Sequence, residues 1–448
     1  MDSKDLLVIG GGPAGLVAAI RAAEMGLDVT LAEKGELGGV CLNRGCIPSK
    51  SLATASDLAY YPRNSSKMGI KVDLEVDYEE IVSWSDSNID RIVSGVNRML
   101  DRADVDLKKA EASFISSNEA EISGEKLEFD KAIIATGSIP EGIPDIRVDH
   151  DRVINSEDFF DLTSLPEKIV VLGAGYVGME LGTICAKLGS DVTIVEMLDQ
   201  ILPNFSKRVV TPVARKGSKI GLDIQLGLKV TEVEIGDGVI VRAEDENSEE
   251  RTFYGDRCLV SVGRVPTTEG LELGNTDVEL DEKGFVETCE NFRTEDSNIY
   301  AVGDVVGGKM LAHEAYNDSV VAVDDILGGD SENSVIPEVV FTDPQIAKVG
   351  GFKEEYDIGR TSFRAVGAAH TKGKAEGVVQ LAVDGEGVIR GGRIVGPYAS
   401  EIIHEVAIAV ENGLKARDVV RTVHAHPTIS EGIMRAAEDA MDLPSSGF

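Results

Sequence analysis

Apolar runs and amphipathic stretches alternate along the first part of the chain. Residues 6–9 form an apolar run typical of a buried strand, residues 16–25 have the spacing of a helix, and residues 28–32 again favour a strand. This order predicts a βαβ unit, in which a helix connects two parallel strands.

The same order returns at a constant offset. Gly173 follows an apolar run just as Gly10 does, and the strand at 191–195 repeats the Asp-Val-Thr of residues 28–30. Gly173 lies 163 positions after Gly10, and the same step leads from Glu33 to Glu196. Matching over so many positions predicts a duplicated unit and an α/β architecture with two Rossmann-like domains.

Further patterns extend this organisation towards the C-terminus. We expect a long amphipathic helix over residues 74–99 and alternating strands with acidic turns over 229–254. Three strands are each expected to end in a short turn, at 131–138, 258–266 and 298–304. Past about residue 336 the pattern changes to strand runs at 339–341 and 377–384 and then a helix over 400–412. We therefore expect a separate C-terminal α+β domain.

Each repeat carries a glycine fingerprint at its first strand-to-helix turn. In the G-x-G-x-x-G spacing, the first glycine makes the tight turn, the second admits a pyrophosphate and the third lets helix and strand pack. An acid at the end of the second strand then accepts hydrogen bonds from a ribose. The chain thus predicts two dinucleotide sites, one with Gly10, Gly12, Gly15 and Glu33 and the other with Gly173, Gly175, Gly178 and Glu196.

The second site is predicted to prefer NAD over NADP. Glu196 is followed by Met197, Leu198 and Asp199, and no Lys or Arg occurs before Lys207. A 2′-phosphate there would meet carboxylates without a nearby cation, whereas the acid suits a free ribose hydroxyl.

Composition favours an intracellular multidomain protein. The 448 residues, 42% of them hydrophobic, are enough to bury several cores. Only five cysteines occur, at 41, 46, 185, 258 and 289, which is too few for a disulfide-stapled secreted protein. An apolar strand begins by Asp5, and no apolar run reaches the length of a membrane span. We therefore expect a cytoplasmic protein without a signal peptide.

The formal net charge of −34 narrows the range of partners. Nucleic-acid binding needs a basic face, so the charge excludes that class. High salt screens the self-repulsion that such a charge creates. The acidic composition therefore favours a halophilic protein over one that is merely acidic.

The stretch from Gly38 to Lys50 places two cysteines five positions apart. Cys41 and Cys46 could not be bridged on a regular helix, but the glycines between 38 and 45 allow a distorted turn before a helix that begins near Pro48. A dithiol at a helix N-terminus has a lowered thiolate pKa and can cycle between dithiol and disulfide. Two unpaired structural cysteines are the alternative. No second close cysteine pair completes a zinc site, so no metal is expected.

A second candidate for chemistry lies near the C-terminus. Pro427 keeps His426 out of a helix, and a helix beginning near Ser430 presents Glu431 close by. A carboxylate bonded to one imidazole nitrogen raises the basicity of the other, so this pair is a candidate general base. On this segment alone, a capping motif with a surface histidine is an equal alternative.

Three segments together resemble the flavin disulfide oxidoreductases, namely residues 38–50, 310–313 and 424–431. The likeness covers essentially the whole chain and is greatest to members that oxidise dihydrolipoamide. It implies an FAD-binding domain at 1–147, an NAD-binding domain at 148–268, a central domain at 269–335 that completes the FAD-binding part, and a dimerisation domain at 336–448.

The resemblance also implies roles for single residues. The implied catalytic residues are Cys41, Cys46, His426, Glu431, Lys50 and Glu180. FAD would be held by the first fingerprint and Glu33, together with Lys50, Ala112, Thr136, Gly137, Asp304 and Ala312. NAD would be held by the second fingerprint and Glu196, together with Val230 and Gly263. Tyr176 matches a side chain that covers the nicotinamide pocket when NAD is absent.

The implied reaction is the oxidation of dihydrolipoamide with NAD as hydride acceptor. The substrate would be carried by lipoyl-bearing domains of a 2-oxoacid dehydrogenase or glycine cleavage complex. In a homodimer, His426 and Glu431 of one subunit would serve the dithiol of the other, and Cys46 would pass the electron pair to FAD. The alternative is an NAD(P)H-dependent reductase of a low-molecular-weight thiol disulfide, which shares these residues but usually takes NADPH.

Overall fold

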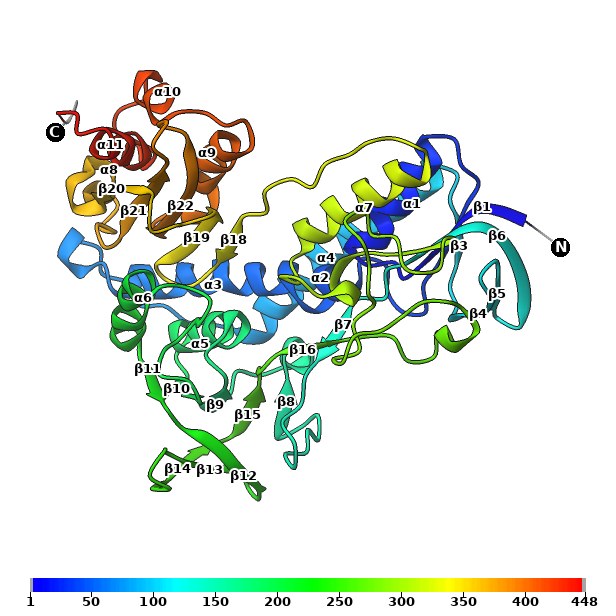
Figure 1. Ribbon diagram of the computed structural model, residues 1–448. Helices are drawn as coiled ribbons and strands as arrows, with labels where there is room; N and C mark the ends of the chain where they lie inside the picture. The colour runs from blue at the N-terminus through cyan, green and yellow to red at the C-terminus, as the bar shows by residue number, and fades with distance from the viewer. Residues whose placement is uncertain (1–2, 445–448) are drawn as a thin grey trace.

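The computed structural model describes residues 3–444. Two domains with parallel sheets lie beside each other, and a third, C-terminal domain packs above the second (Figure 1). Helix α3 (Cys46–Arg63) runs between the three domains. The predicted fold class, with two Rossmann-like domains and a C-terminal α+β domain, is confirmed. Within the described residues, no helix is both long and apolar enough to cross a membrane.

The first domain is built on the first βαβ unit. Its sheet consists of β1 (Ser3–Ile9), β2 (Val29–Ala32), β3 (Asp106–Lys108), β4 (Ala112–Ser116), β5 (Glu119–Ile122), β6 (Glu125–Ile134) and β17 (Ile299–Ala301). The order is β3-β2-β1-β6-β5-β4, and β17 joins β6 in parallel from far along the chain. β1 is central because its last four residues are apolar and buried on both faces.

Three helices cover this sheet: α1 (Pro13–Glu24), α4 (Tyr78–Arg102) and α7 (Ala312–Ile326). α1 and α7 pack against each other, and Ser319 Oγ donates a hydrogen bond to the Ala14 carbonyl at 2.9 Å. The predicted start of the long helix near residue 74 is wrong. Asp77 caps α4 by accepting a hydrogen bond from the Glu80 N–H, so the helix begins at Tyr78.

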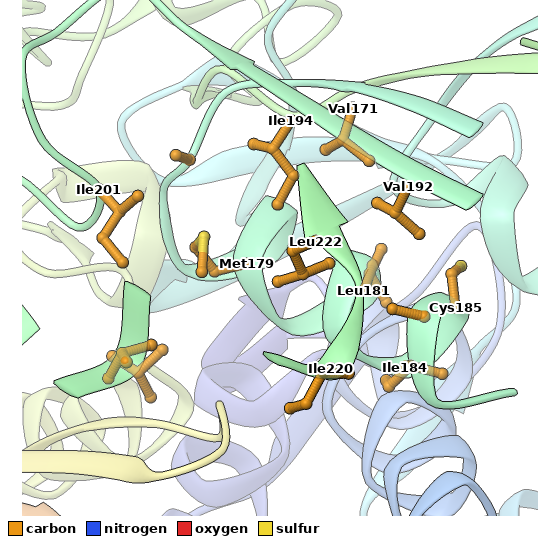
Figure 2. Close-up of a cluster of buried hydrophobic side chains, with 14 of the residues drawn as sticks. Val171, Met179, Leu181, Ile184, Cys185, Val192, Ile194, Ile201, Ile220 and Leu222 are labelled. Carbon is orange, nitrogen blue, oxygen red and sulfur yellow. The ribbon is translucent and has the colours of Figure 1, made fainter. Parts of the chain in front are cut away.

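The second domain is also built on a parallel sheet with helices packed on it. Its sheet has the order β11-β10-β9-β15-β8, from strands β8 (Val153–Asn155), β9 (Lys168–Leu172), β10 (Asp191–Glu196), β11 (Leu222–Leu226) and β15 (Arg257–Val260). Two helices, α5 (Tyr176–Leu188) and α6 (Lys207–Ile220), pack with it. Figure 2 shows Val171, Val192 and Ile194 of the sheet above Met179 and Leu181 of α5.

The acidic strands 229–254 form a separate antiparallel sheet at the lower end of this domain (Figure 1). They are β12 (Lys229–Ile235), β13 (Val239–Glu244) and β14 (Glu250–Gly255). Cys185 lies in the domain core, where burial raises the pKa of its thiol to about 12. Burial does the same for Cys258, so both behave as small apolar side chains.

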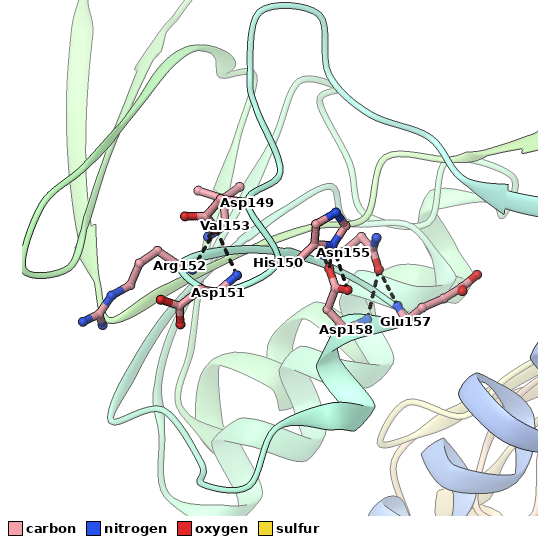
Figure 3. A network of polar contacts seen from close by, with 8 residues as sticks. All are labelled: Asp149, His150, Asp151, Arg152, Val153, Asn155, Glu157 and Asp158. Atoms are coloured by element: carbon pink, nitrogen blue, oxygen red, sulfur yellow. Dashed lines mark hydrogen bonds and ion pairs between the residues drawn. The ribbon is translucent and has the colours of Figure 1, made fainter.

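The chain crosses between the first two domains twice, and the two crossings pair with each other. β7 (Ser138–Pro140) and β16 (Arg264–Pro266) form a two-stranded antiparallel ribbon. The segment that follows β7 is fixed by short-range polar contacts (Figure 3). There Asp149 Oδ1 accepts three backbone N–H bonds, and His150 Nδ1 lies 3.0 Å from the Asp158 carboxylate. His150 therefore has a structural role.

The third domain is an antiparallel sheet with helices packed on it. The order is β18-β19-β22-β21-β20, from strands β18 (Glu338–Val340), β19 (Gln345–Gly350), β20 (Asp357–Ser362), β21 (Val378–Val383) and β22 (Ile389–Gly396). The helices are α8 (Gly367–Thr371), α9 (Ala399–Glu411), α10 (Ala416–Arg421) and α11 (Glu431–Ala440). The predicted strands and the helix at 400–412 are thus confirmed, with bounds shifted by one or two residues.

Candidate active site

The two cysteines lie on consecutive helices that are separated by one residue. Cys41 is in α2 (Gly39–Arg44), and Cys46 opens α3. Gly45, with φ −152° and ψ −104°, breaks the helical path, and a Cβ there would press on the Val40 carbonyl. The expected distortion is therefore confirmed at Gly45, and the helix predicted to begin near Pro48 begins two residues earlier. The chain is helical on both sides of one glycine, and α3 begins at Cys46 itself.

This break brings the two thiols into hydrogen-bond contact. The hydrogen bond from the Cys41 thiol is the largest factor that lowers the pKa of Cys46, to about 7, against the opposing effect of burial. Lys50, one turn along α3, lowers it further. The same contact and burial raise the pKa of Cys41. In the reduced pair, Cys46 is therefore the thiol that ionises first as the pH rises through 7, and Cys41 stays protonated.

Lys50 is held by an acid of the second domain. Its Nζ lies 2.8 Å from Glu180 Oε2, and the other carboxylate oxygen of Glu180 accepts the Phe341 N–H at 2.9 Å. The Lys50 ammonium also lies 4.2 Å from the centre of the Phe341 ring. One ion pair thus fixes a positive charge beside the dithiol and joins all three domains.

Both glycine fingerprints lie at the turns that the spacing predicts. Gly10 has φ +105° and Gly173 has φ +102°, a conformation that glycine adopts without strain. Side chains at Gly15 and Gly178 would clash with the carbonyls of Gly10 and Gly173, so close packing of helix on strand requires glycine there.

The N-termini of α1 and α5 are left open. No side chain caps either helix, and neither has an acidic residue in its first turn. A Cβ built on Gly175 would meet nothing within 4 Å, and one on Gly12 only Gly39 at 4.0 Å. Free N–H groups facing open space at a helix start suit a pyrophosphate, so both units fit the dinucleotides that the sequence predicts.

The two acids make the same contacts in the two units. Glu196 accepts hydrogen bonds from the Ala174 N–H at 2.7 Å and the Leu198 N–H at 2.8 Å. Glu33 does the same with the Gly11 and Gly35 N–H groups. These bonds fix each carboxylate beside its fingerprint turn, where a ribose would lie.

The remaining residues predicted for FAD gather along one edge of the first sheet. Thr136 and Gly137 follow β6, and Asp304 follows the adjacent strand β17. Asp304 Oδ2 accepts a hydrogen bond from Ser138 Oγ at 2.5 Å. Ala112 begins the strand β4, and Ala312 begins α7. Val230 of β12 and Gly263 after β15 belong to the second domain.

His426 and Glu431 form the predicted pair. His426 Nδ1 lies 2.9 Å from Glu431 Oε1, and Glu431 Oε2 accepts the Thr428 N–H at 2.9 Å. Burial opposes ionisation of Glu431, but these two hydrogen bonds outweigh it and lower the pKa of the carboxyl. The His426 side chain is 63% exposed in the single chain, so its imidazole is oriented by a buried carboxylate and open on its other side.

Within one chain this pair does not meet the dithiol. His426 belongs to the segment that leads into α11 of the third domain, whereas α2 packs beside α4 in the first, and Figure 1 shows α11 and α2 well apart. The structure thus brings together Cys41, Cys46, Lys50 and Glu180, and it keeps His426 and Glu431 together elsewhere.

Comparison with known proteins places the chain in a family. Residues 4–319 match the model of the pyridine nucleotide-disulphide oxidoreductases, and residues 336–437 match the dimerisation domain of the same family. The chain belongs to this family. Membership implies an FAD cofactor, a pyridine nucleotide substrate and assembly as a homodimer.

Individual members of the family match over nearly the full length. A dihydrolipoyl dehydrogenase of Halobacterium salinarum is 40% identical over 98% of this chain and 96% of its own length. Dihydrolipoyl dehydrogenase 2 of Haloarcula marismortui is 41% identical over 97% and 96%. Among solved structures, LpdA of Mycobacterium tuberculosis has a TM-score of 0.90 at 26% identity, over 97% of this chain and 99% of that one.

Two residues of the site were not predicted from the sequence. Tyr316 of α7 lies near the dithiol, since its pKa is raised first by burial and then by the charges of Cys41 and Cys46. Asp318, on the buried face of α7, accepts the Gly303 N–H at 3.2 Å, and burial raises its pKa to about 7. No motif marks either residue. Only the packing of α7 against the β17 turn reveals them.

Proposed function

We propose that this protein oxidises dihydrolipoamide with NAD⁺, as a dihydrolipoyl dehydrogenase. The observation that carries the proposal is the contact between Cys41 and Cys46, in which Cys46 has a lowered pKa and lies near Lys50, in a chain that aligns over its length with two dihydrolipoyl dehydrogenases. A dithiol of unequal pKa is suited to exchange with a second dithiol, because one sulfur is ready to leave as a thiolate.

The residues proposed to hold FAD lie at the carboxyl ends of strands of the first sheet, at or near the helix starts beside it, or, for Ala112, at the start of β4. They are Gly10, Gly12, Gly15, Glu33, Lys50, Ala112, Thr136, Gly137, Asp304 and Ala312. FAD held by these residues would supply a two-electron carrier between the dithiol and NAD⁺. The residues proposed for NAD are Gly173, Gly175, Gly178, Glu196, Val230 and Gly263.

The exchange steps follow from the thiol chemistry. His426 removes a proton from one substrate thiol, and the hydrogen bond to Glu431 stabilises the resulting imidazolium. The substrate thiolate attacks the Cys41 sulfur of the oxidised pair, so that a mixed disulfide forms and Cys46 leaves as a thiolate. The second substrate thiol then attacks the mixed disulfide, releases cyclic oxidised lipoamide and leaves Cys41 as a thiol. Two electrons thus pass from substrate to the Cys41–Cys46 pair.

The base must come from a second subunit. Within one chain, α11 lies well apart from α2, which carries Cys41 (Figure 1), and the His426 side chain is largely exposed. We propose that the homodimer places His426 and Glu431 of one subunit over the dithiol of the other. Lipoyl-bearing domains of a 2-oxoacid dehydrogenase or glycine cleavage complex are the proposed substrate carriers, in the cytoplasm.

NAD is the proposed nucleotide because the three residues after Glu196 offer a 2′-phosphate no cation, and the next lysine is paired with an acid. Met197 and Leu198 are exposed and apolar, and Lys207 lies 3.0 Å from the Asp199 carboxylate. The alternative function, an NAD(P)H-dependent reductase of a small thiol disulfide, is less well supported since such enzymes usually need NADPH.

One assay series tests the proposal. The purified holoenzyme is offered NADH or NADPH, each with lipoamide and with several small thiol disulfides, at high salt. We expect turnover of NADH with lipoamide, and its loss in Cys46→Ser with FAD still bound, as read from flavin absorbance. Turnover of a small disulfide with NADPH alone would overturn the assignment.

A further inference from the structure

Tyr176 lies on α5 between Gly175, at the start of the helix, and Glu180, which holds Lys50. It is the first residue of α5 and follows Gly175, where the pyrophosphate is proposed to bind. Glu180, four residues on, lies on the same face of the helix and holds Lys50 beside the dithiol. If a nucleotide binds at the start of α5 and extends along this face towards Lys50, the Tyr176 ring lies on its way.

The hydroxyl of Tyr176 is tied to a residue that the sequence did not single out. It donates a hydrogen bond to Glu338 Oε2 at 3.0 Å, at the start of β18 in the third domain. Glu338 is buried, and two lysines surround it: Lys348 Nζ at 3.0 Å and Lys309 Nζ at 3.3 Å. Burial opposes its charge, but the lysines and the tyrosine outweigh this effect and lower its pKa. The bond from Tyr176 is therefore charge-assisted.

The ring of Tyr176 is held as well as its hydroxyl. It packs edge-on against Phe205, with centroids 5.8 Å apart. Lys348, which pairs with Glu338, also contacts Phe205. Its ammonium lies 4.8 Å from the centre of the Phe205 ring and donates a hydrogen bond to the Asn204 carbonyl. The Tyr176 side chain is therefore held by contacts from both the second and the third domain.

We propose that Glu338, charged and positioned by Lys309 and Lys348, is a latch that holds Tyr176 across the path of the nicotinamide. Binding of the nucleotide must break the bond between Tyr176 and Glu338, so Glu338 weakens nucleotide binding and slows it. Glu338 is a positioning residue that acts through Tyr176. The proposal rests on the proposed function, since it takes the second unit as the NAD site.

Two variants test the hydrogen bond between Tyr176 and Glu338, one at each partner. Tyr176→Phe keeps the ring and loses the hydroxyl, and Glu338→Gln keeps the size and loses the charge. NADH binding to the holoenzyme is followed by flavin fluorescence, together with KM and kcat of the lipoamide reaction. We expect each variant to bind NADH roughly fivefold to tenfold more tightly with faster association, and the double variant to gain little more. Tyr254→Phe, at an exposed tyrosine of β14, is the matched control and should change nothing.

The outcomes distinguish a latch from a pure charge effect and from a structural contact. Unchanged NADH affinity in both single variants overturns the proposal. A gain in Glu338→Gln that Tyr176→Phe lacks, or additive gains, means that Glu338 acts on the nucleotide by charge alone and also overturns it. A lowered melting temperature at constant affinity shows a merely structural contact and overturns it too. Wild-type protein that neither binds NADH nor reduces lipoamide with it would instead refute the proposed function.

Discussion

Lys50 Nζ lies 2.8 Å from Glu180 Oε2, and this ion pair joins the helix that begins with Cys46 to the helix that begins at the second nucleotide fingerprint. The two residues are 130 positions apart. The pair places a fixed positive charge next to a thiol whose pKa is already lowered, so charge and redox chemistry are coupled in one site.

The first prediction concerns the Cys46 thiolate. Its pKa of about 7 means that the thiolate fraction of the reduced enzyme rises as the pH rises through 7 and falls below it. Because Lys50 favours the thiolate, Lys50→Met should raise this pKa, whereas Lys50→Arg should keep it close to the wild-type value. Thiolate absorbance against pH measures it, with Cys46→Ser as the blank. Superimposable curves for Lys50→Met and wild type would contradict the role of Lys50.

The second prediction concerns the oriented histidine. Glu431→Gln should keep the shape of the His426 segment but remove the charge that stabilises the imidazolium. We expect dihydrolipoamide oxidation to slow on the order of 100-fold, with flavin-to-NAD⁺ hydride transfer unchanged. Rapid-mixing measurements of the two half-reactions test this. Equal slowing of both would argue against a general-base role.

The third prediction concerns nucleotide choice. Wild type should favour NADH over NADPH on the order of 100-fold in kcat/KM, because the 2′-phosphate would meet Glu196. Met197 is 61% exposed, and Met197→Arg supplies a cation there. This variant should raise kcat/KM for NADPH and leave kcat/KM for NADH unchanged, so the ratio of the two becomes smaller. Steady-state kinetics with both nucleotides give the ratio, and a change in NADH kinetics alone would be inconsistent with a charge-based preference at Glu196.

The fourth prediction concerns a buried lysine where the domains meet. Lys187 has a side chain only 5% exposed and pairs with Asp57 and with Asp343, which also accepts the Tyr61 hydroxyl. Lys187→Met should cost about 3 kcal/mol of unfolding free energy, since it leaves Asp343 charged and buried. Lys207→Met, at an exposed pair, should cost less than about 1 kcal/mol.

The unfolding free energy lost in Lys187→Met should become smaller as the pH falls. Burial raises the pKa of Asp343, but Lys187 and Tyr61 outweigh it and hold the pKa below the ordinary carboxyl value. The stabilisation is therefore present above the unfolded pKa of the carboxyl and is lost as the pH falls through the folded value. Denaturant unfolding at neutral and acid pH should show a smaller difference between Lys187→Met and wild type in acid. A constant difference would contradict the assignment.

The fifth prediction concerns salt. With a net charge of −34, the folded chain should be stabilised by screening, so the melting temperature should rise steadily from low to molar salt. Chloride salts of sodium and potassium should act alike if screening is the cause. A melting temperature independent of salt would refute the halophilic interpretation.

Local spacing was enough to predict much of this protein. Buried strands, glycine turns and terminal acids obey short-range rules, because a βαβ unit is specified by residues within about 30 positions. The duplicated fingerprints, Glu33 and Glu196, and the pairing of His426 with Glu431 therefore follow from the sequence. Resemblance, and not spacing, supplied the pairing of Lys50 with Glu180.

Other features depended on tertiary packing. The glycine spacing predicts a distorted turn near Gly45, but the thiol contact that makes the two pKa values unequal depends on the way α2 and α3 meet. Glu338, Lys309 and Lys348 come from three separate segments, and each reads in the sequence as an ordinary surface charge. Their proposed shared role depends on the third domain, which brings Glu338 into hydrogen-bond contact with Tyr176 of α5. The sequence by itself determined the chemistry that each unit carries. Contacts between domains decided which of these groups lie together, because no local sequence pattern records which distant surfaces will be buried against each other.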